Sequence, residues 1–126
     1  MYLADTHVFL FWMGTPERLS PRVRNIIEDE SDSVFFSTAS LWEIVIKHGI
    51  GKLSGVEPEE VLPSVRNQGW RILDIKASHI LGLRALPTIH ADPFDRLLVA
   101  QAIEEDLALL SRDPLVARYP LRVVWG

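Results

Sequence analysis

The sequence predicts an α/β fold, with a central parallel sheet of four to five strands flanked by helices. Short, continuously apolar segments alternate along the chain with segments of helical periodicity. Continuous apolarity is typical of strands that are buried on both faces, and strands joined through helices run parallel. We therefore expect helices on both faces of the sheet.

The N-terminal third contains the first predicted strand and two helices. Residues 2–4 predict a short buried strand, and residues 6–13 continue as an apolar helix that ends before a glycine and a proline. Ser20 can supply an N-cap hydroxyl, and Pro21 suits the first helical position. We expect a charged helix from there to about Glu30.

The middle third predicts two more strands with helices between them. Residues 34–37 are apolar and predict the second strand. Residues 38–48 repeat apolar side chains on one helix face and are followed by glycine, which favours a helix end. Another helix is expected to start near Pro58, and residues 71–75 predict the third strand.

The C-terminal third predicts two helices and two strands. Residues 77–86 predict a helix closed by the proline that follows. Asp92 and Pro93 open a further helix that extends through Ile103. Residues 108–111 and 122–125 are mainly apolar and predict the fourth and fifth strands.

Length and composition limit the classes of protein to be considered. The 126 residues, 48% of them hydrophobic, suffice for one core but not for two ordinary domains, so we expect a single domain over 1–126. The absence of cysteine excludes a disulfide framework and cysteine-ligated metals. No apolar run approaches the roughly 20 residues that cross a bilayer, and no leader pattern is present. We expect a cytoplasmic protein without a membrane partner.

Four acids occupy comparable places in the predicted fold. Asp5 follows the first strand, Glu43 lies in the first turns of the helix after the second, Asp95 begins a later helix, and Asp113 follows the fourth strand. Strand-to-helix junctions of a parallel sheet share one edge, where ligands collect. Carboxylates gathered there repel one another unless a cation joins them. We therefore expect a divalent metal site.

Magnesium suits such a site because it prefers oxygen ligands in octahedral geometry and keeps several waters. A metal-bound water can attack a phosphodiester while the ion stabilises the leaving oxygen. The sequence thus favours metal-assisted hydrolysis and leaves open whether one ion or two are used.

Each acid also has a purely structural interpretation. Asp5 and Asp113 can cap helices, while Ser40 with Glu43 and Asp92 with Asp95 have the spacing of capping boxes. The helix dipole favours acids at these positions as well. A non-catalytic binding module whose acids only cap helices therefore stays an alternative.

The net charge of −4 argues against a broad nucleic-acid-binding face. Without the four candidate site acids, however, 17 − 4 = 13 acids balance 13 lysines and arginines. Nucleic acid would then be held by the metal and by local cations such as Lys47, Lys52, Arg96 and Arg112. His90 lies close to Asp95 in sequence, so it is a candidate neighbour of the site together with Arg96.

Four segments together resemble PIN-domain toxins of the VapC type. They are LADTH (3–7), STASLWEI (37–44), HADPFDRLLVAQA (90–102) and LSRD (110–113). The resemblance covers nearly the whole chain and implies a PIN-like three-layer fold. It also implies an Mg²⁺-dependent endoribonuclease, with Mn²⁺ as a substitute, that hydrolyses RNA as the toxin of a toxin–antitoxin pair.

The resemblance assigns roles to single residues. Asp5, Glu43, Asp95 and Asp113 match the family's catalytic and metal-binding acids, and Asp92 is a neighbour, since the recurring acid of the family matches Asp95.

The resemblance also implies the surroundings of the acids and the partners. Thr6 and Ser111 match small hydroxyl residues near the site, although threonine is more usual at the position of Ser111. Members commonly form homodimers and pair with a small antitoxin that covers the active-site groove. The helix with Phe9 and Trp12 would help to form that groove. The target RNA, the identity of the antitoxin and the dimer geometry are not predicted.

A phosphoacceptor signalling domain of the receiver type is a further alternative. Receiver domains have similar size, alternate strands and helices, and hold magnesium with acids at strand ends. They normally carry paired acids after the first strand and a lysine late in the chain. In this sequence Thr6 follows Asp5 and the last lysine is Lys76, so the resemblance is weak.

Overall fold

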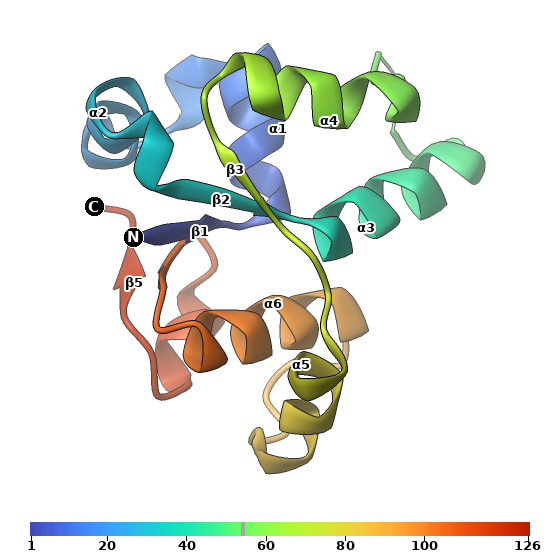
Figure 1. Ribbon diagram of the computed structural model, residues 1–126, viewed down its shortest axis with the longest axis vertical. Helices are drawn as coiled ribbons and strands as arrows, with labels where there is room; N and C mark the ends of the chain where they lie inside the picture. Colours follow the sequence, from blue (N-terminus) through green and yellow to red (C-terminus); the bar gives the residue numbers. More distant parts are fainter. Residues whose placement is uncertain (54) are drawn as a thin grey trace.

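A five-stranded, all-parallel sheet forms the centre of the computed structural model, which describes residues 1–53 and 55–126 (Figure 1). The strands are β1 (Tyr2–Ala4), β2 (Val34–Ser37), β3 (Arg71–Leu73), β4 (Ala108–Leu110) and β5 (Val123–Val124). Their order in the sheet is β3-β2-β1-β4-β5. The predicted fold class and strand number are confirmed.

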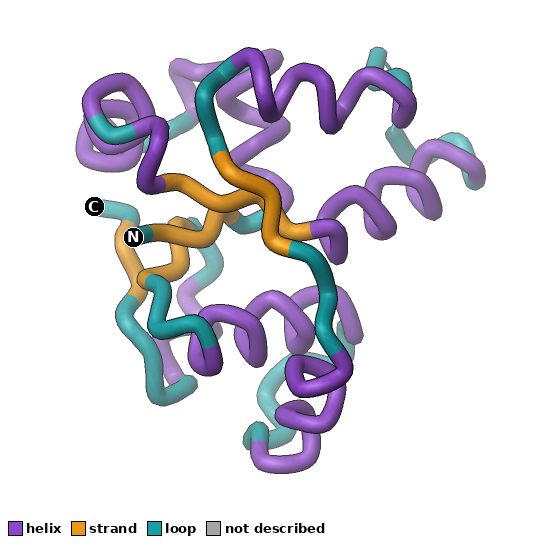
Figure 2. Tube along the Cα trace, in the orientation of Figure 1, coloured by secondary structure: helices purple, strands orange, loops and turns teal. Residues whose placement is uncertain are grey.

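Helices cover both faces of this sheet, as predicted. They are α1 (Thr6–Gly14), α2 (Pro21–Asp29), α3 (Thr38–Gly49), α4 (Pro58–Asn67), α5 (Ala77–Gly82) and α6 (Pro93–Glu104). Helices α1, α2 and α4 lie on one face, and α5 and α6 lie on the other (Figures 1 and 2). Val8, Val23 and Val65 belong to the core on the first face, and Leu98 and Val99 to the core on the second. Within the described residues, no helix is long and apolar enough to cross a membrane.

The predicted helix 77–86 is shorter in the structure. Helix α5 ends at Gly82, and Leu83–Ala85 form a 3-10 turn. Glycine is a weak helix former. The guanidinium of Arg96 donates to the carbonyls of Leu83 (3.3 Å) and Pro87 (2.9 Å), so this contact from α6 fixes the turn.

The sheet has a switch point between β1 and β4. Leu3 of β1 pairs with Phe35 of β2 on one side and with Leu109 of β4 on the other. The chain leaves β1 toward β2 and leaves β4 toward β5, in opposite directions across the sheet. Such a point leaves a crevice outside the carboxyl ends of the two strands. Asp5 stands there, and its N–H donates to the carbonyl of Leu110 at 3.0 Å.

Candidate active site

A polar cavity of about 220 Å³ contains most of the predicted acids. Its wall includes Asp5 at the end of β1, Glu43 of α3, and Asp92 and Asp95 at the start of α6. Among the described residues that line the cavity, Lys47 is the one lysine or arginine. Four carboxylates thus face one ammonium group.

Asp5 is held in place by both of its carboxylate oxygens. Oδ1 accepts the N–H of Thr6 at 2.7 Å, which caps α1, and Oδ2 accepts the hydroxyl of Ser111 at 2.7 Å. Nδ1 of His7 lies 3.5 Å from Oδ2. Only 6% of Asp5 is exposed, and burial raises the pKa of its carboxyl although His7 and Ser111 act to lower it.

Glu43 is fixed by a hydroxyl and an ammonium group. The Thr6 hydroxyl donates to Oε1 at 2.6 Å, and Nζ of Lys47 lies 2.6 Å from Oε2. The pKa of Lys47 is raised mainly by this hydrogen bond. Oγ of Ser40 lies 2.8 Å from the Thr6 hydroxyl. Since the Thr6 hydroxyl has one proton and donates it to Glu43, the Ser40 hydroxyl must donate to the oxygen of Thr6.

The proposed capping box of Ser40 and Glu43 is not formed. Ser37 is the N-cap of α3, and its hydroxyl accepts the N–H of Ala39 at 2.9 Å. Helix α3 therefore begins at Thr38, and both Ser40 and Glu43 lie inside it. The capping interpretation of Glu43 is wrong, because the carboxylate is directed to Thr6 and Lys47 instead of the helix start.

Asp92 and Asp95 bring two further carboxylates from one helix end. Asp92 caps α6 by accepting the N–H of Phe94 at 2.8 Å, so its interpretation as a cap is confirmed. The reciprocal hydrogen bond of a capping box between Asp92 and Asp95 is not found among the described residues. Asp95 stands in the first turn. Burial raises the pKa of Asp95 to about 6, with added repulsion from Asp92 and Asp5.

Asp113 lies beside this cavity and is not among the residues that line it. One nitrogen of His90 and one carboxylate oxygen each from Asp95 and Asp113 lie within 4.8 Å of one another. Nε2 of His90 is 2.7 Å from Oδ2 of Asp113. Partial burial raises the pKa of Asp113. The hydrogen bonds from His90 and from the N–H of Leu115, together with the charges of His90 and His7, outweigh burial, and the net pKa is below the ordinary value.

Tyr119 fixes the proton of the buried His90. The Tyr119 hydroxyl accepts the main-chain N–H of His90 at 3.1 Å and lies 2.9 Å from Nδ1, and the two rings are stacked. A hydroxyl that accepts one N–H can donate its own proton to Nδ1. The ring proton of His90 then stands on Nε2 and is donated to Asp113.

The predicted neighbours occupy different places. Thr6 and Ser111 contact the acids directly, and His90 contacts Asp113. Arg96 is not among the residues that line the cavity, since its guanidinium bonds the main chain near α5. Phe9 lines a second cavity, described below. Trp12 donates its indole N–H to Gln68 at 2.9 Å and is not part of that lining.

Several contacts of the site were not inferred from the sequence, among them that of His7 with Asp5. Lys47 lies four residues after Glu43, a spacing that predicts an ion pair on one helix face. Ser40 lies three residues before Glu43, so the helical period places both on one side. The contact of Tyr119 with His90 could not be predicted from the sequence, because the position of Tyr119 depends on the path of the chain after β4.

The donor set of the cavity fits a hard divalent cation. The side chains of Asp5, Glu43, Asp92 and Asp95 offer carboxylate oxygens, which Mg²⁺ prefers, and no described residue offers a thiolate. Lys47 is the one ammonium group among the lining residues, and burial together with the neighbouring Asp92 and Asp5 raises the pKa of Asp95. A dication is the counter-charge that this arrangement lacks.

Comparison with known proteins places the chain in a family. Among solved structures, it resembles a chain of VapBC2 from Rickettsia felis bound to a promoter DNA fragment, with a TM-score of 0.74, 19% identity and coverage of 99% of this chain and 98% of that chain. A chain of DNA-bound VapBC from Salmonella typhimurium matches with a TM-score of 0.71 and 18% identity, covering 98% of this chain and 96% of that chain. A chain of FitAcB from Neisseria gonorrhoeae matches with a TM-score of 0.63 and 21% identity, covering 100% of this chain and 97% of that chain.

These structures share the fold at low sequence identity, and no curated protein matches the sequence. A model of the PIN domain family, however, matches residues 2–120. The chain therefore belongs to the PIN domain family, as its sequence motifs predicted.

Proposed function

We propose that this chain is an endoribonuclease that depends on Mg²⁺, with Mn²⁺ as a substitute. Asp5, Glu43, Asp95 and Asp113 would hold the metal. The observation that carries the proposal is the cavity in which Asp5, Glu43, Asp92 and Asp95 meet with too little positive charge. Membership of the PIN family supports a nuclease.

The residues of the chain prepare the site for this reaction. A bound Mg²⁺ would supply an acidified water for attack on phosphorus and would stabilise the leaving oxygen. Thr6 N–H and Ser111 orient the carboxylate of Asp5, and Thr6 with Lys47 orients that of Glu43. Carboxylates fixed in this way need little rearrangement when the site is loaded.

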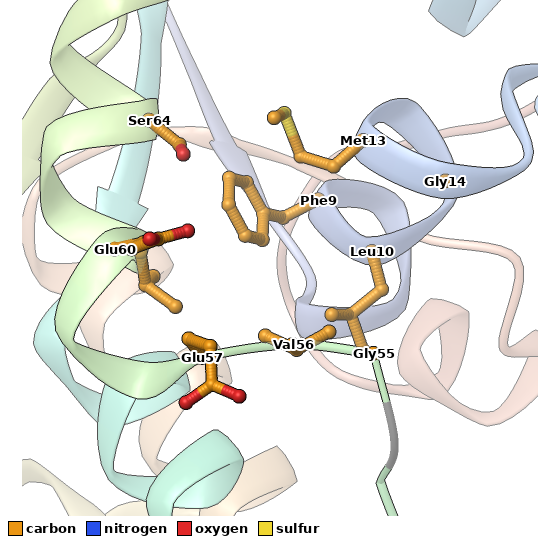
Figure 3. Close-up of a pocket in the computed structure, with 10 residues that line it drawn as sticks. Phe9, Leu10, Met13, Gly14, Gly55, Val56, Glu57, Glu60 and Ser64 are labelled. Carbon is orange, nitrogen blue, oxygen red and sulfur yellow. The ribbon is translucent and has the colours of Figure 1, made fainter.

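We further propose that the nuclease is the toxin of a toxin–antitoxin pair. The similar structures include the toxin–antitoxin complex of Klebsiella pneumoniae and the VapBC complexes. A second cavity of about 230 Å³ lies between α1 and α4 (Figure 3). Phe9, Leu10 and Met13 face it from α1, and Glu57 and Glu60 add negative charge on the other side.

An antitoxin segment with apolar and basic side chains would fit this second cavity. Leu10 lines both cavities, so a segment bound there would lie next to the acids and could block them. Phe9 would contact the antitoxin directly. Trp12 lies against Gln68, and its proposed role would be to support the wall.

The exposed face of α3 supports the proposed homodimer. Trp42, Val45, Ile46 and Ile50 repeat at helical spacing and are between 45% and 62% exposed. A second copy would cover this apolar face. The toxin would meet its RNA and its antitoxin in the cytoplasm.

Substitution of single acids tests the nuclease. Asp5→Asn and Asp95→Asn should each abolish Mg²⁺-dependent cleavage of RNA while the protein stays folded. Asp74→Asn is the matched control, because Asp74 follows β3 at the same edge of the sheet but is exposed and does not line the cavity. Full cleavage by both site variants, measured on gels with and without EDTA, would refute the assignment and leave a binding module.

A further inference from the structure

Two arginines lie over one aromatic ring beside the acid cavity. The guanidinium carbons of Arg18 and Arg112 are 4.4 Å and 5.0 Å from the centroid of the Phe11 ring. Both arginines are exposed. Among the described residues, neither guanidinium forms an ion pair or donates a hydrogen bond to the protein, unlike those of Arg24 and Arg96. The Phe11 ring thus positions both guanidinium groups, and their N–H donors remain free to bind a ligand.

This pair is tied to the candidate active site by short contacts. Arg112 stands between Ser111, which donates to Asp5, and Asp113. Its main-chain N–H donates to Nε2 of His7 at 3.0 Å. The His7 ring lines the acid cavity and lies 5.5 Å from the Phe11 ring. His7 thus lies both at the wall of the cavity and near the ring that carries the two arginines.

The chemistry of the two surfaces is complementary for a phosphodiester chain. The cavity is acidic and the whole chain has a net charge of −4, so neither attracts a polyanion. A planar guanidinium matches the geometry of a phosphate and binds it through two parallel N–H groups. A nucleic-acid strand would therefore be held beside the acids by the bound metal and by local cations of this kind.

We propose that Arg18 and Arg112 bind backbone phosphates of the RNA strand next to the bond that is cleaved. This inference rests on the proposed function, since it takes RNA as the substrate. It adds a binding subsite that reads the backbone and not the bases. The arginines contribute to affinity for RNA and not to the chemical step.

Salt dependence of RNA binding tests the subsite without cleavage. The full chain is titrated in EDTA with a labelled, short, single-stranded RNA of mixed sequence at several salt concentrations. Loss of one phosphate contact lowers the slope of log K against log salt by about 0.7. We expect this change for Arg18→Gln and Arg112→Gln, about twice as much for the double variant, and none for Arg66→Gln. Arg66 is an exposed arginine near the end of α4 and serves as the matched control.

Two further readouts separate binding from packing and from chemistry. Arg18→Lys and Arg112→Lys keep the charge and should keep most of the slope. In cleavage assays with Mg²⁺, the double glutamine variant should show a raised KM and an unchanged kcat. Lysine variants with the same salt slope as the glutamine variants, a double glutamine variant with the slope of Arg66→Gln, or a fall in kcat alone would each overturn the inference.

The outcomes also separate this inference from the proposed function. If the chain binds RNA through these arginines but cleaves none in Mg²⁺, the nuclease is refuted and the subsite stands. If the chain cleaves RNA and the double variant keeps the wild-type KM, the subsite is refuted and the nuclease stands.

Discussion

Asp95 shows how strongly the cavity acids act on one another. Its pKa of about 6 lies above its ordinary value of 3.8, first because of burial and then because of Asp92 and Asp5. A raised carboxyl pKa stabilises the fold below the unfolded value and loses this contribution as the pH rises through the folded value. The metal-free protein is therefore destabilised by Asp95 above about pH 6. The full shift would correspond to about 3 kcal/mol, but solvent screening of a partly exposed group reduces it to about 1 kcal/mol.

The variant Asp95→Asn should therefore stabilise the metal-free protein at neutral pH. We expect the free energy of unfolding in EDTA to rise by about 0.5–1 kcal/mol, since asparagine also gives up a favourable charge near the helix start. The gain should shrink as the pH falls below 6 and vanish below about pH 3, where Asp95 is protonated in both the folded and the unfolded state. Urea denaturation at the two pH values measures it. A variant less stable than the wild type at neutral pH would show that the ionised carboxylate of Asp95 does not destabilise the metal-free protein.

Tyr119→Phe removes the hydroxyl that fixes the proton of His90 and keeps the ring. The buried main-chain N–H and Nδ1 of His90 then lose their partner, which should cost about 1–3 kcal/mol of stability. The ¹⁵N chemical shift of Nδ1 of His90 should also change because this nitrogen loses its hydrogen-bond donor, while Nε2 stays protonated toward Asp113. Tyr2→Phe is the control, because no hydrogen bond of the Tyr2 hydroxyl is found among the described residues. Unchanged ¹⁵N shifts in Tyr119→Phe would contradict the proposed proton position.

At the scale of elements, a buried histidine joins α5 to α6. His79 is fully buried, Nδ1 accepts the N–H of Lys76 at 3.0 Å, and Nε2 lies 3.0 Å from both Glu104 and Glu105. Because Nδ1 accepts a main-chain N–H, the ring proton is on Nε2 and is donated to these carboxylates. The group is thus a hydrogen-bond clamp and not a metal site, although its ligand atoms lie close enough to hold an ion.

Removal of this clamp should loosen α5. We expect His79→Ala to lower the free energy of unfolding by about 2–4 kcal/mol, because it leaves a cavity and an unpaired N–H. His48→Ala, at the end of α3, should change the free energy of unfolding by less than about 0.5 kcal/mol.

The clamp also depends on pH. Hydrogen bonds from Lys76 and His79 lower the pKa of Glu105, so the stability that Glu105 contributes is present above pH 4.5, its ordinary pKa, and is lost as the pH falls through its folded pKa. Equal stability of the two alanine variants, measured by urea denaturation, would argue against the clamp.

The sequence predicted elements better than their ends. Ser20 and Pro21 marked the start of α2 because capping depends on neighbouring residues only. The early end of α5 was missed because it depends on Arg96, which reaches the turn from another helix. The start of α3 at Thr38 was predicted, whereas the capping box within it was wrong, because two serines compete and only the fold selects Ser37.

At the scale of the whole molecule, topology explains why distant acids could be predicted to meet. Parallel strands end at one edge, so Asp5, Glu43, Asp95 and Asp113 were expected together. The first three line one cavity, and Asp113 is not among its lining residues. The order of the strands and the position of Asp113 beside the cavity could not be predicted, since they depend on which strands pair. The partners that orient the acids, such as Tyr119, depend on the same long-range packing.

Direct titration of metal tests the central claim that these acids form a site for a hard dication. Calorimetry with Mg²⁺ and with Mn²⁺, at a pH above the pKa of Asp95, should show uptake by the wild type and by Asp74→Asn. Asp5→Asn should bind at least about tenfold more weakly, because it removes a charged ligand. Absence of uptake of both ions by the wild type, or equal affinity in Asp5→Asn, would contradict the account.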